Sequence, residues 1–260
     1  MIIDFHTHCY PDALAPRALS GVDDDAEGDS DGTLAGMLAE LSAAGVDRAV
    51  LLPVCPRPGH EKTVNDFALS VSGERIIPFF SVHPFTPGAD ELIREYAKRG
   101  YIGVKFHPNL QRFVLGDPKL LPVWRAVRDC KLIAVFHCGR PGRCDTEYDV
   151  YPSDFIPLFG TLDPHKVVLA HTGGYGISDN EIELLAHTEA YADLSIAPKQ
   201  FSPERFARVL DLIPPSRLLF GSDTPWGNTK ITLDMIRSSV SDPDALSLIL
   251  GDNARRLLGI

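Results

Sequence analysis

The sequence predicts a single-domain α/β protein of the (β/α)8, or TIM-barrel, type. Eight short runs of β-branched and aromatic residues alternate with segments that carry apolar residues at helical spacing. The strand-like runs are apolar almost throughout, as is typical of parallel strands covered on both faces. The chain has 260 residues, and about 250 residues is the ordinary length of one such barrel.

The strand and helix segments follow one another along the whole chain. The expected strands are residues 2–8, 48–54, 76–83, 102–107, 132–137, 166–171, 190–196 and 218–223. The expected helices are residues 34–44, 61–70, 89–99, 118–130, 179–187, 203–213 and 228–240. These eight strands and seven helices span nearly the whole sequence, so we expect one domain over residues 1–260.

A doubly wound open sheet is the alternative to the barrel. Such sheets commonly bind their ligand at a glycine-rich turn after the first strand. Here the first expected strand ends in His6-Thr7-His8-Cys9 instead. The sequence therefore favours the barrel.

The charge of the chain argues against a nucleic-acid partner. Lys and Arg number 25 against 35 Asp and Glu, for a formal net charge of −10. Proteins that bind phosphate backbones need a basic face. Six of the acids lie in residues 21–32, which predicts an exposed, mobile loop. A calcium-binding loop would need a closing Glu that this segment lacks.

The sequence also indicates a cytoplasmic protein that acts on a small molecule. The chain opens without a basic and apolar leader, and no stretch reaches the ~18 apolar residues of a membrane span. The five cysteines form no C-x-x-C pair. Neither a disulfide framework nor a structural zinc ribbon is therefore expected.

Polar residues gather where the expected strands end. In a barrel, the chemistry collects at the carboxyl ends of the strands. Six of the nine histidines lie there, together with one lysine and one aspartate. The residues are His6, His8, His83, Lys105, His107, His137, His171 and Asp223.

The first strand carries the most specific signal. His6 and His8 are two residues apart, so both imidazoles project from the same face of the strand. Two adjacent imidazoles can hold a borderline cation such as zinc, and His137 and Asp223 could complete the ligand set. Taken singly, a strand-end histidine is more often a hydrogen-bonded core residue. Asp223 could instead cap the helix that follows it.

Other polar residues near the strand ends have two interpretations each. Lys105 could form a salt bridge or act as a Schiff-base nucleophile. Arg112, Arg140 and Arg143 could hold a substrate carboxylate with bidentate hydrogen bonds, or could be solvated surface arginines. Similarly, Trp226 and Phe85 could form an apolar wall of the site or simply pack beneath a loop.

The sequence motifs at the strand ends resemble those of the amidohydrolase superfamily. More narrowly, they are similar to those of the amidohydrolase-2 branch, which includes the aminocarboxymuconate-semialdehyde decarboxylases and related hydrolases and lactonases. The matching segments are Asp4-Phe5-His6-Thr7-His8, Gly103-Val104-Lys105-Phe106-His107-Pro108, Phe136-His137-Cys138-Gly139, Leu169-Ala170-His171-Thr172-Gly173-Gly174, Phe220-Gly221-Ser222-Asp223-Thr224-Pro225-Trp226 and Asn253-Ala254-Arg255-Arg256-Leu257-Leu258.

The resemblance implies a distorted (β/α)8 barrel with a divalent metal at its mouth. The ligands of a single metal would be His6, His8, His137 and Asp223, with His171 contacting the metal-bound water or the substrate. In a two-metal variant, a carbamylated Lys105 would bridge the ions, and His137 and His171 would bind the second. We expect one Zn²⁺, with Mn²⁺ or Fe²⁺ as alternatives, and the relatives suggest a homodimer.

These observations lead to one expected function and three alternatives. We expect a hydrolase that uses a metal-activated water on a small carboxylate-bearing amide, lactone or ester, with His171 and Asp223 as catalytic residues. The alternatives are a non-oxidative decarboxylase of an aromatic or muconate-type acid, a Schiff-base lyase that uses Lys105, and a binding protein without catalysis. The expected substrate-binding residues are His83, His107, Arg112, Arg140 and Trp226.

Overall fold

The computed structural model describes residues 1–20, 30–140 and 146–260. They form two compact units. The first unit consists of Met1–Leu51, Val71–Ile77 and Ala192–Ile260, and the second consists of Leu52–Ser70 and Pro78–Tyr191. Both alternate strands with helices, which confirms the α/β class that the sequence predicts.

The strands of the first unit lie side by side around β1 (Ile3–Thr7). β1 pairs in parallel with β2 (Arg48–Leu51), which is followed in the sheet by β3 (Ile76–Pro78). On the other side of β1, Phe5 N donates to Phe220 O at 2.8 Å, just after β9 (Leu218–Leu219). β9 pairs in parallel with the end of β8 (Tyr191–Asp193).

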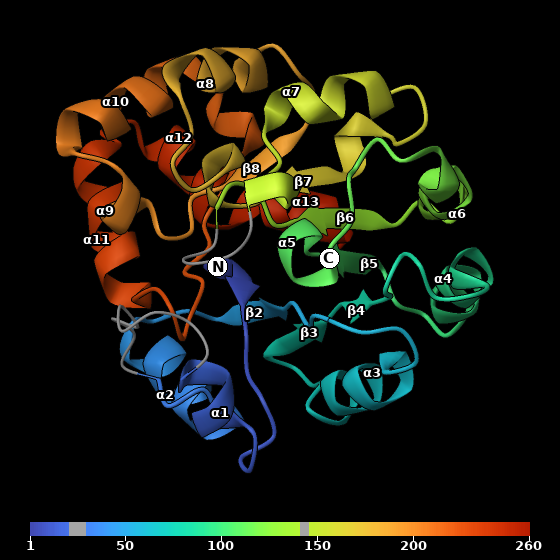
Figure 1. Cartoon of the computed structure of the whole chain (residues 1–260). Coiled ribbons are helices and arrows are strands. Elements are labelled where there is room, and N and C mark those ends of the chain that lie inside the picture. Colours follow the sequence, from blue (N-terminus) through green and yellow to red (C-terminus); the bar gives the residue numbers. More distant parts are fainter. Residues whose placement is uncertain (21–29, 141–145) are drawn as a thin grey trace. The chain divides into compact units, whose positions relative to one another are not determined.

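Helices cover these strands. α11 (Thr229–Ser239) packs against three other helices of the unit, α2 (Leu34–Ala43), α9 (Ala197–Gln200) and α10 (Pro203–Leu212) (Figure 1). α11 turns its apolar residues Leu233 and Ile236 inward. The remaining helices are α1 (Ala15–Ser20), α12 (Pro243–Ser247) and α13 (Asn253–Leu258).

The second unit contains four parallel strands in chain order. They are β4 (Phe80–Ser81), β5 (Gly103–Phe106), β6 (Ile133–Phe136) and β7 (Val167–Leu169). The helices before, between and after them are α3 (Glu61–Ser70), α4 (Ala89–Lys98), α5 (Pro108–Gln111), α6 (Leu121–Asp129), α7 (Pro152–Phe155) and α8 (Asp179–Ala186). α4 and α6 lie side by side (Figure 1).

An aromatic cluster forms the core of the second unit. The ring of Phe106 stacks on Phe136 at 5.3 Å, and Trp124 and Phe155 meet this pair edge-on. All four side chains are fully buried. The indole N–H of Trp124 is satisfied by Leu115 O at 3.2 Å, so this large side chain adds apolar burial without an unpaired donor.

The prediction of one continuous strand over residues 76–83 is wrong. The chain forms β3 and then β4, with Phe79 between them. Pro78 ends β3 and has no N–H with which to continue a ladder, which explains the break. The predicted strands 190–196 and 218–223 are also too long, because β8 ends at Asp193 and β9 at Leu219.

Three further expectations concern the acidic segment 21–32, the cysteines and membrane-spanning helices. Most of the acidic segment 21–32, residues 21–29, lies outside the described residues. The cysteines of the described part, Cys9, Cys55, Cys130 and Cys138, form no disulfide with one another. Among the described residues, no helix combines the length and apolar character needed to cross a membrane.

Gly103 at the start of β5 gives a test of core packing. A Cβ added there would lie 2.2 Å from the ring of buried Phe79, whereas one added at Gly116 would meet nothing within 4 Å. We expect Gly103→Ala to lower the free energy of unfolding by about 1–3 kcal/mol, the usual cost of overpacking a core. Urea denaturation would measure it, with Gly116→Ala as the control. Equal effects of the two variants would contradict this account of the packing.

Candidate active site

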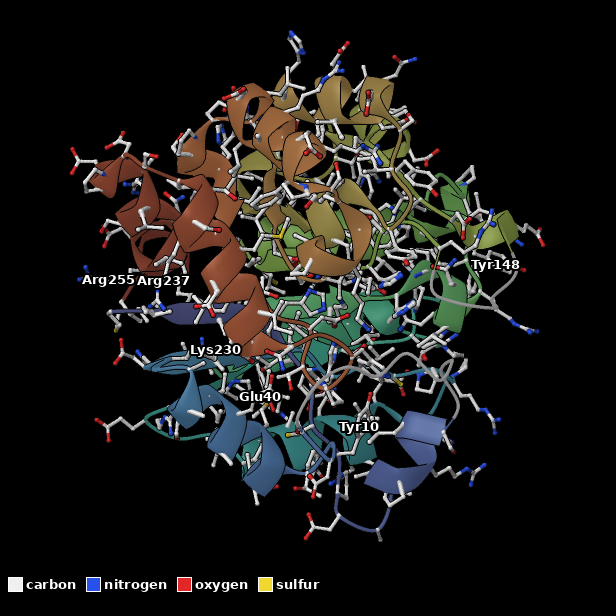
Figure 2. All side chains as sticks on the ribbon, turned by 90° about the vertical axis from the view of Figure 1, so that its left-hand side faces the viewer. Tyr10, Glu40, Tyr148, Lys230, Arg237 and Arg255 are labelled. Carbon is white, nitrogen blue, oxygen red and sulfur yellow. The ribbon has the colours of Figure 1, made fainter. Side chains whose placement is uncertain are left out.

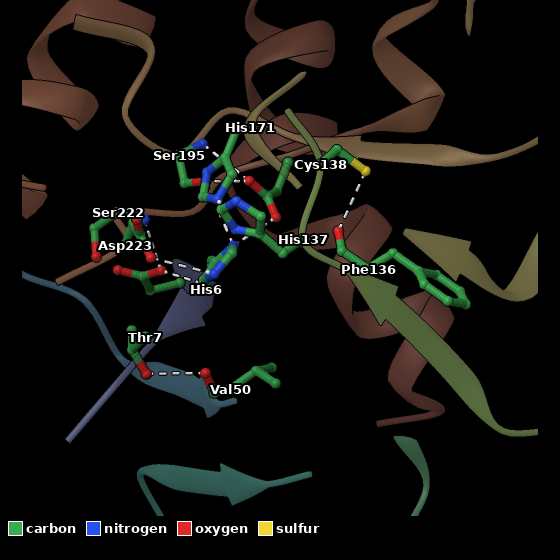
Figure 3. A network of polar contacts seen from close by, with 12 residues as sticks. His6, Thr7, Val50, Phe136, His137, Cys138, His171, Ser195, Ser222 and Asp223 are labelled. Atoms are coloured by element: carbon green, nitrogen blue, oxygen red, sulfur yellow. Dashed lines mark hydrogen bonds and ion pairs between the residues drawn. The ribbon is translucent and has the colours of Figure 1, made fainter. Parts of the chain in front are cut away.

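His6 and His8 point the same way from β1, as their spacing predicts. Thr7 between them points to the other side, where its hydroxyl donates to Val50 O of β2 at 2.9 Å (Figure 3). The Nε2 atoms of the two imidazoles are 3.1 Å apart. Both side chains are buried, so this pair of nitrogens is held in a fixed position away from bulk water.

Asp223 joins the two histidines from the segment after β9. Its Oδ1 lies 3.2 Å from His6 Nε2 and 3.1 Å from His8 Nε2. The residue adopts a left-handed backbone conformation (φ 65°), which Asp tolerates better than most residues, and its N–H donates to His6 O at 2.8 Å. Asp223 does not cap the next helix, because Asn228 caps α11 through its contact with Ile231 N.

Asp193 is a site residue that the sequence analysis missed. Its Oδ2 lies 2.8 Å from His6 Nδ1, and both side chains are fully buried. Its other oxygen accepts hydrogen bonds from the backbone N–H and the hydroxyl of Ser195. The sequence does contain a signal for it. Asp193 and Ser195 are two residues apart at the end of the predicted strand 190–196, so their polar side chains share a face.

The chemistry of these donor atoms fits a zinc ion. A carboxylate can only accept from His6 Nδ1, so in the neutral ring Nε2 would carry a lone pair directed at His8 and Asp223. Ligand atoms bound at about 2.0–2.1 Å to one tetrahedral zinc ion lie about 3.3 Å apart. The three atoms here are separated by 3.1–3.2 Å. A carboxylate behind a ligating imidazole is also the usual support of such a ligand.

Asp4 and Gly221 hold the two ligand-bearing segments together. Asp4 Oδ1 accepts from His6 N at 3.1 Å and from Ser222 N at 3.0 Å. Burial raises the pKa of Asp4 to about 7, against the opposing hydrogen bonds from Ser222 and His6. A Cβ at Gly221 would lie 2.9 Å from the Cβ of His6, so the close approach of the two segments requires glycine there.

The second unit brings together three other predicted site residues, His107, His137 and His171. The rings of His107 and His137 are stacked, with centroids 3.8 Å apart and planes 7° from parallel. His137 Nδ1 lies 3.1 Å from His171 Nε2 (Figure 3). His171 has a left-handed backbone (φ 58°). We call these three side chains the imidazole array.

His83 and Lys105 are buried residues of the same unit. His83 follows β4, and its backbone N–H contacts Glu61 Oε1 at 3.3 Å. Burial lowers the pKa of the His83 imidazole, although the charge of Glu61 opposes that shift. Lys105 lies on β5 with 1% of its surface exposed, and Ser81 Oγ donates to its backbone carbonyl at 2.9 Å.

The remaining predicted residues are more exposed. Arg140 is 56% exposed and contacts Asp149 Oδ2 through Nε at 3.3 Å, while Arg112 is exposed at the end of α5. Trp226 is half-buried, with its ring edge-on to His8 at 5.1 Å and to Tyr10 at 6.0 Å. Phe85 is 40% exposed. Arg143 lies outside the described residues.

Solved structures of known proteins resemble the whole chain. An uncharacterized TIM-barrel protein from Bordetella bronchiseptica is 20% identical with a TM-score of 0.76, over 99% of this chain and 98% of that one. An amidohydrolase from Burkholderia multivorans with bound zinc is 17% identical, with a TM-score of 0.71 over 100% and 99% of the two chains. The 5-carboxyvanillate decarboxylase of Sphingomonas paucimobilis is 17% identical, with a TM-score of 0.72 over 100% and 99%.

These similarities confirm the predicted TIM-barrel fold. The comparison with curated proteins found no match. A family model, Amidohydro_2, with the description "Amidohydrolase", matches residues 3–260. The resemblance drawn from the strand-end motifs is thus confirmed, and the chain belongs to the amidohydrolase family of enzymes.

Proposed function

We propose that this chain is a zinc-dependent hydrolase of small carboxylate-bearing amides, lactones or esters. The observation that carries the proposal is the convergence of three buried donor atoms, from His6, His8 and Asp223, with Asp193 behind His6. Nitrogen and carboxylate donors in this number suit zinc better than the harder cations, which prefer oxygen ligands. Mn²⁺ and Fe²⁺ are the alternative ions.

The proposal assigns His137 as the fourth ligand. His137 follows directly after β6, and the carboxyl ends of barrel strands carry the active site in this fold. Its ring is already oriented by the stack with His107 and by the contact with His171. An ordered ring loses little side-chain entropy when it binds a metal.

His171 and Asp223 are the proposed catalytic residues. When bound, zinc lowers the pKa of a coordinated water to about 7 and polarises a substrate carbonyl. His171 would accept a proton from the attacking water, and Asp223 would pass a proton to the leaving group. A positioned acid or base of this kind contributes roughly 10²–10⁴-fold to the rate.

The same proposal gives roles to five substrate-binding residues. The Nδ1 atoms of His83 and His107 accept backbone N–H groups, from Phe85 and Leu110 respectively, each at 3.3 Å. The neutral rings would therefore carry their proton on Nε2 and could donate it to a substrate oxygen. Arg112 and Arg140 would bind the substrate carboxylate, and Trp226 would form an apolar wall.

Decarboxylation is the second candidate, since one of the similar structures is a decarboxylase. In that reaction His171 and Asp223 would deliver a proton to the substrate carbon that loses carbon dioxide. Lys105 offers two further alternatives, as a carbamate bridging a second metal or as a Schiff-base nucleophile. We further propose that the protein acts as one domain over residues 1–260, paired as a homodimer, in the cytoplasm and without nucleic-acid or membrane partners.

A substrate screen tests the reaction. We expect purified protein loaded with zinc to hydrolyse at least one member of a panel of carboxylated lactones, amides and esters, and to lose that activity on chelation. Carbon dioxide release would be followed in parallel with aromatic and muconate-type acids. Turnover of these acids alone would replace hydrolysis by decarboxylation, and a borohydride-trapped adduct on Lys105 would favour the lyase.

Two histidine variants separate binding from catalysis. We expect His6→Ala to lose the metal, because it removes a ligand and its contact with Asp193. His171→Ala should keep the metal and lose about 10²–10⁴-fold in turnover. Metal analysis after gel filtration, together with the rate on whichever substrate the screen identifies, would measure both. Equal metal loss in the two variants would instead make His171 a ligand.

His83 predicts a pH dependence of stability. Because its folded pKa is below the ordinary 6.5, the unfolded chain takes up its proton first as the pH falls. The contribution of His83 is therefore complete above pH 6.5 and is lost as the pH falls from there through the folded pKa. We expect His83→Gln to show a smaller drop in unfolding temperature between pH 7.5 and 5 in the presence of a chelator. His165→Gln, at an exposed position, is the control and should follow the wild type.

A further inference from the structure

Glu40 is a buried carboxylate in the middle of α2, a helix without any predicted site residue. Only 7% of its surface is exposed. Oε2 accepts from the Thr224 hydroxyl at 2.5 Å, and Oε1 accepts from both the N–H and the hydroxyl of Thr229 at 2.8 Å. Three donors from one short segment thus converge on a single side chain from a distant part of the sequence (Figure 2 shows its place on the molecule).

The segment that Glu40 holds is the one that carries Asp223. Thr224 follows Asp223 directly, and Thr229 is the first residue of α11. Between them the backbone makes a tight turn, in which Trp226 N and Gly227 N both donate to Asp223 O. A Cβ at Gly227 would lie 2.0 Å from Ser222 O, so the turn is closely folded. Fixing both ends of this turn fixes the backbone from which the Asp223 carboxylate projects.

A charged carboxylate suits this position for two reasons. It accepts three hydrogen bonds, and hydrogen bonds to a charged acceptor are stronger than those to a neutral one. One of them comes from the N-terminus of α11, where the helix dipole stabilises a negative charge. An amide at residue 40 could accept the bonds from Thr229 but would turn its N–H₂ group toward Thr224. An alanine would leave all three donors without this partner.

We propose that Glu40 is a positioning residue of the metal centre, acting through Thr224 and Thr229 to orient the Asp223 carboxylate toward His6 and His8. The inference rests on the proposed metal centre, because its consequence is the affinity for zinc. Glu40 itself does not touch the ligand atoms. It holds the metal-ligand loop, residues 223–229, against α2, and the alternative is a role in stability alone.

Zinc affinity distinguishes positioning from stability. We would measure the dissociation constant by chelator competition in wild type, Glu40→Ala, Glu40→Gln and Thr224→Val, and the visible spectrum of the Co²⁺-loaded proteins. Loss of partners around a metal ligand typically costs 10–100-fold in affinity. We expect that loss for Glu40→Ala, smaller losses for Glu40→Gln and Thr224→Val, and an altered Co²⁺ spectrum in all three.

Two further variants calibrate the result. Asn253→Ala removes a buried side chain of the same unit that contacts Pro215 O and Leu218 O and should lower the unfolding temperature without changing zinc affinity. Asp193→Asn removes the carboxylate behind His6 and should weaken zinc binding by 10–100-fold.

Each outcome supports or overturns the inference. If Glu40→Ala and Thr224→Val bind zinc within twofold of wild type while Asp193→Asn does not, Glu40 is structural and only this inference fails. If the wild type binds no metal, the proposed function fails and this inference with it. Should Glu40→Ala not fold, Glu40→Gln and Thr224→Val decide by the same criterion.

Discussion

The contact between His6 Nδ1 and Asp193 Oδ2 is the interaction on which the rest of the site depends. A neutral imidazole has one proton, and this 2.8 Å contact fixes that proton on Nδ1. His6 Nε2 is then a lone-pair donor directed at His8 and Asp223. Without Asp193, the other tautomer would place a proton where the proposed zinc ion would bind. The position of one hydrogen thus determines whether the three atoms can act as ligands.

The placement of the candidate site residues depends on backbone conformation as well as on strand geometry. Successive side chains along a strand alternate between its two faces, so strand geometry alone directs His6 and His8 to the same side. Asp223 and His171 leave their strands through left-handed conformations, with φ of 65° and 58°. Such conformations are costly for residues other than glycine and persist only where the surroundings hold them. For Asp223, the surroundings include His6 O, the turn to Gly227 and the hold of Glu40 on Thr224 and Thr229.

The residues that could be predicted from the sequence are those whose signal is local. His6 and His8 are recognisable because two residues of spacing on a strand imply one face, and that geometry is confirmed. Asp193 and Glu40 were missed because each is one acid in a segment whose pattern fits an ordinary strand or an amphipathic helix. Asp193 contacts His6, which is 187 residues away in the sequence, and Glu40 contacts Thr224, which is 184 residues away. Their roles arise from these contacts. The break in the predicted strand 76–83 has a local cause, Pro78. The apolar pattern of the segment nevertheless led to the prediction of one continuous strand.

The distribution of buried charge favours a cation at the proposed metal site. In the described part of the first unit, four carboxylates are buried, on Asp4, Glu40, Asp193 and Asp223, and no lysine or arginine is buried with them. Burying carboxylates without compensation is costly. Asp4 responds by a pKa of about 7, and Glu40 by three hydrogen bonds. Asp193 and Asp223 flank two imidazoles, and a divalent ion between those rings would offset their charge. The burial of these carboxylates would therefore make metal binding favourable for the fold.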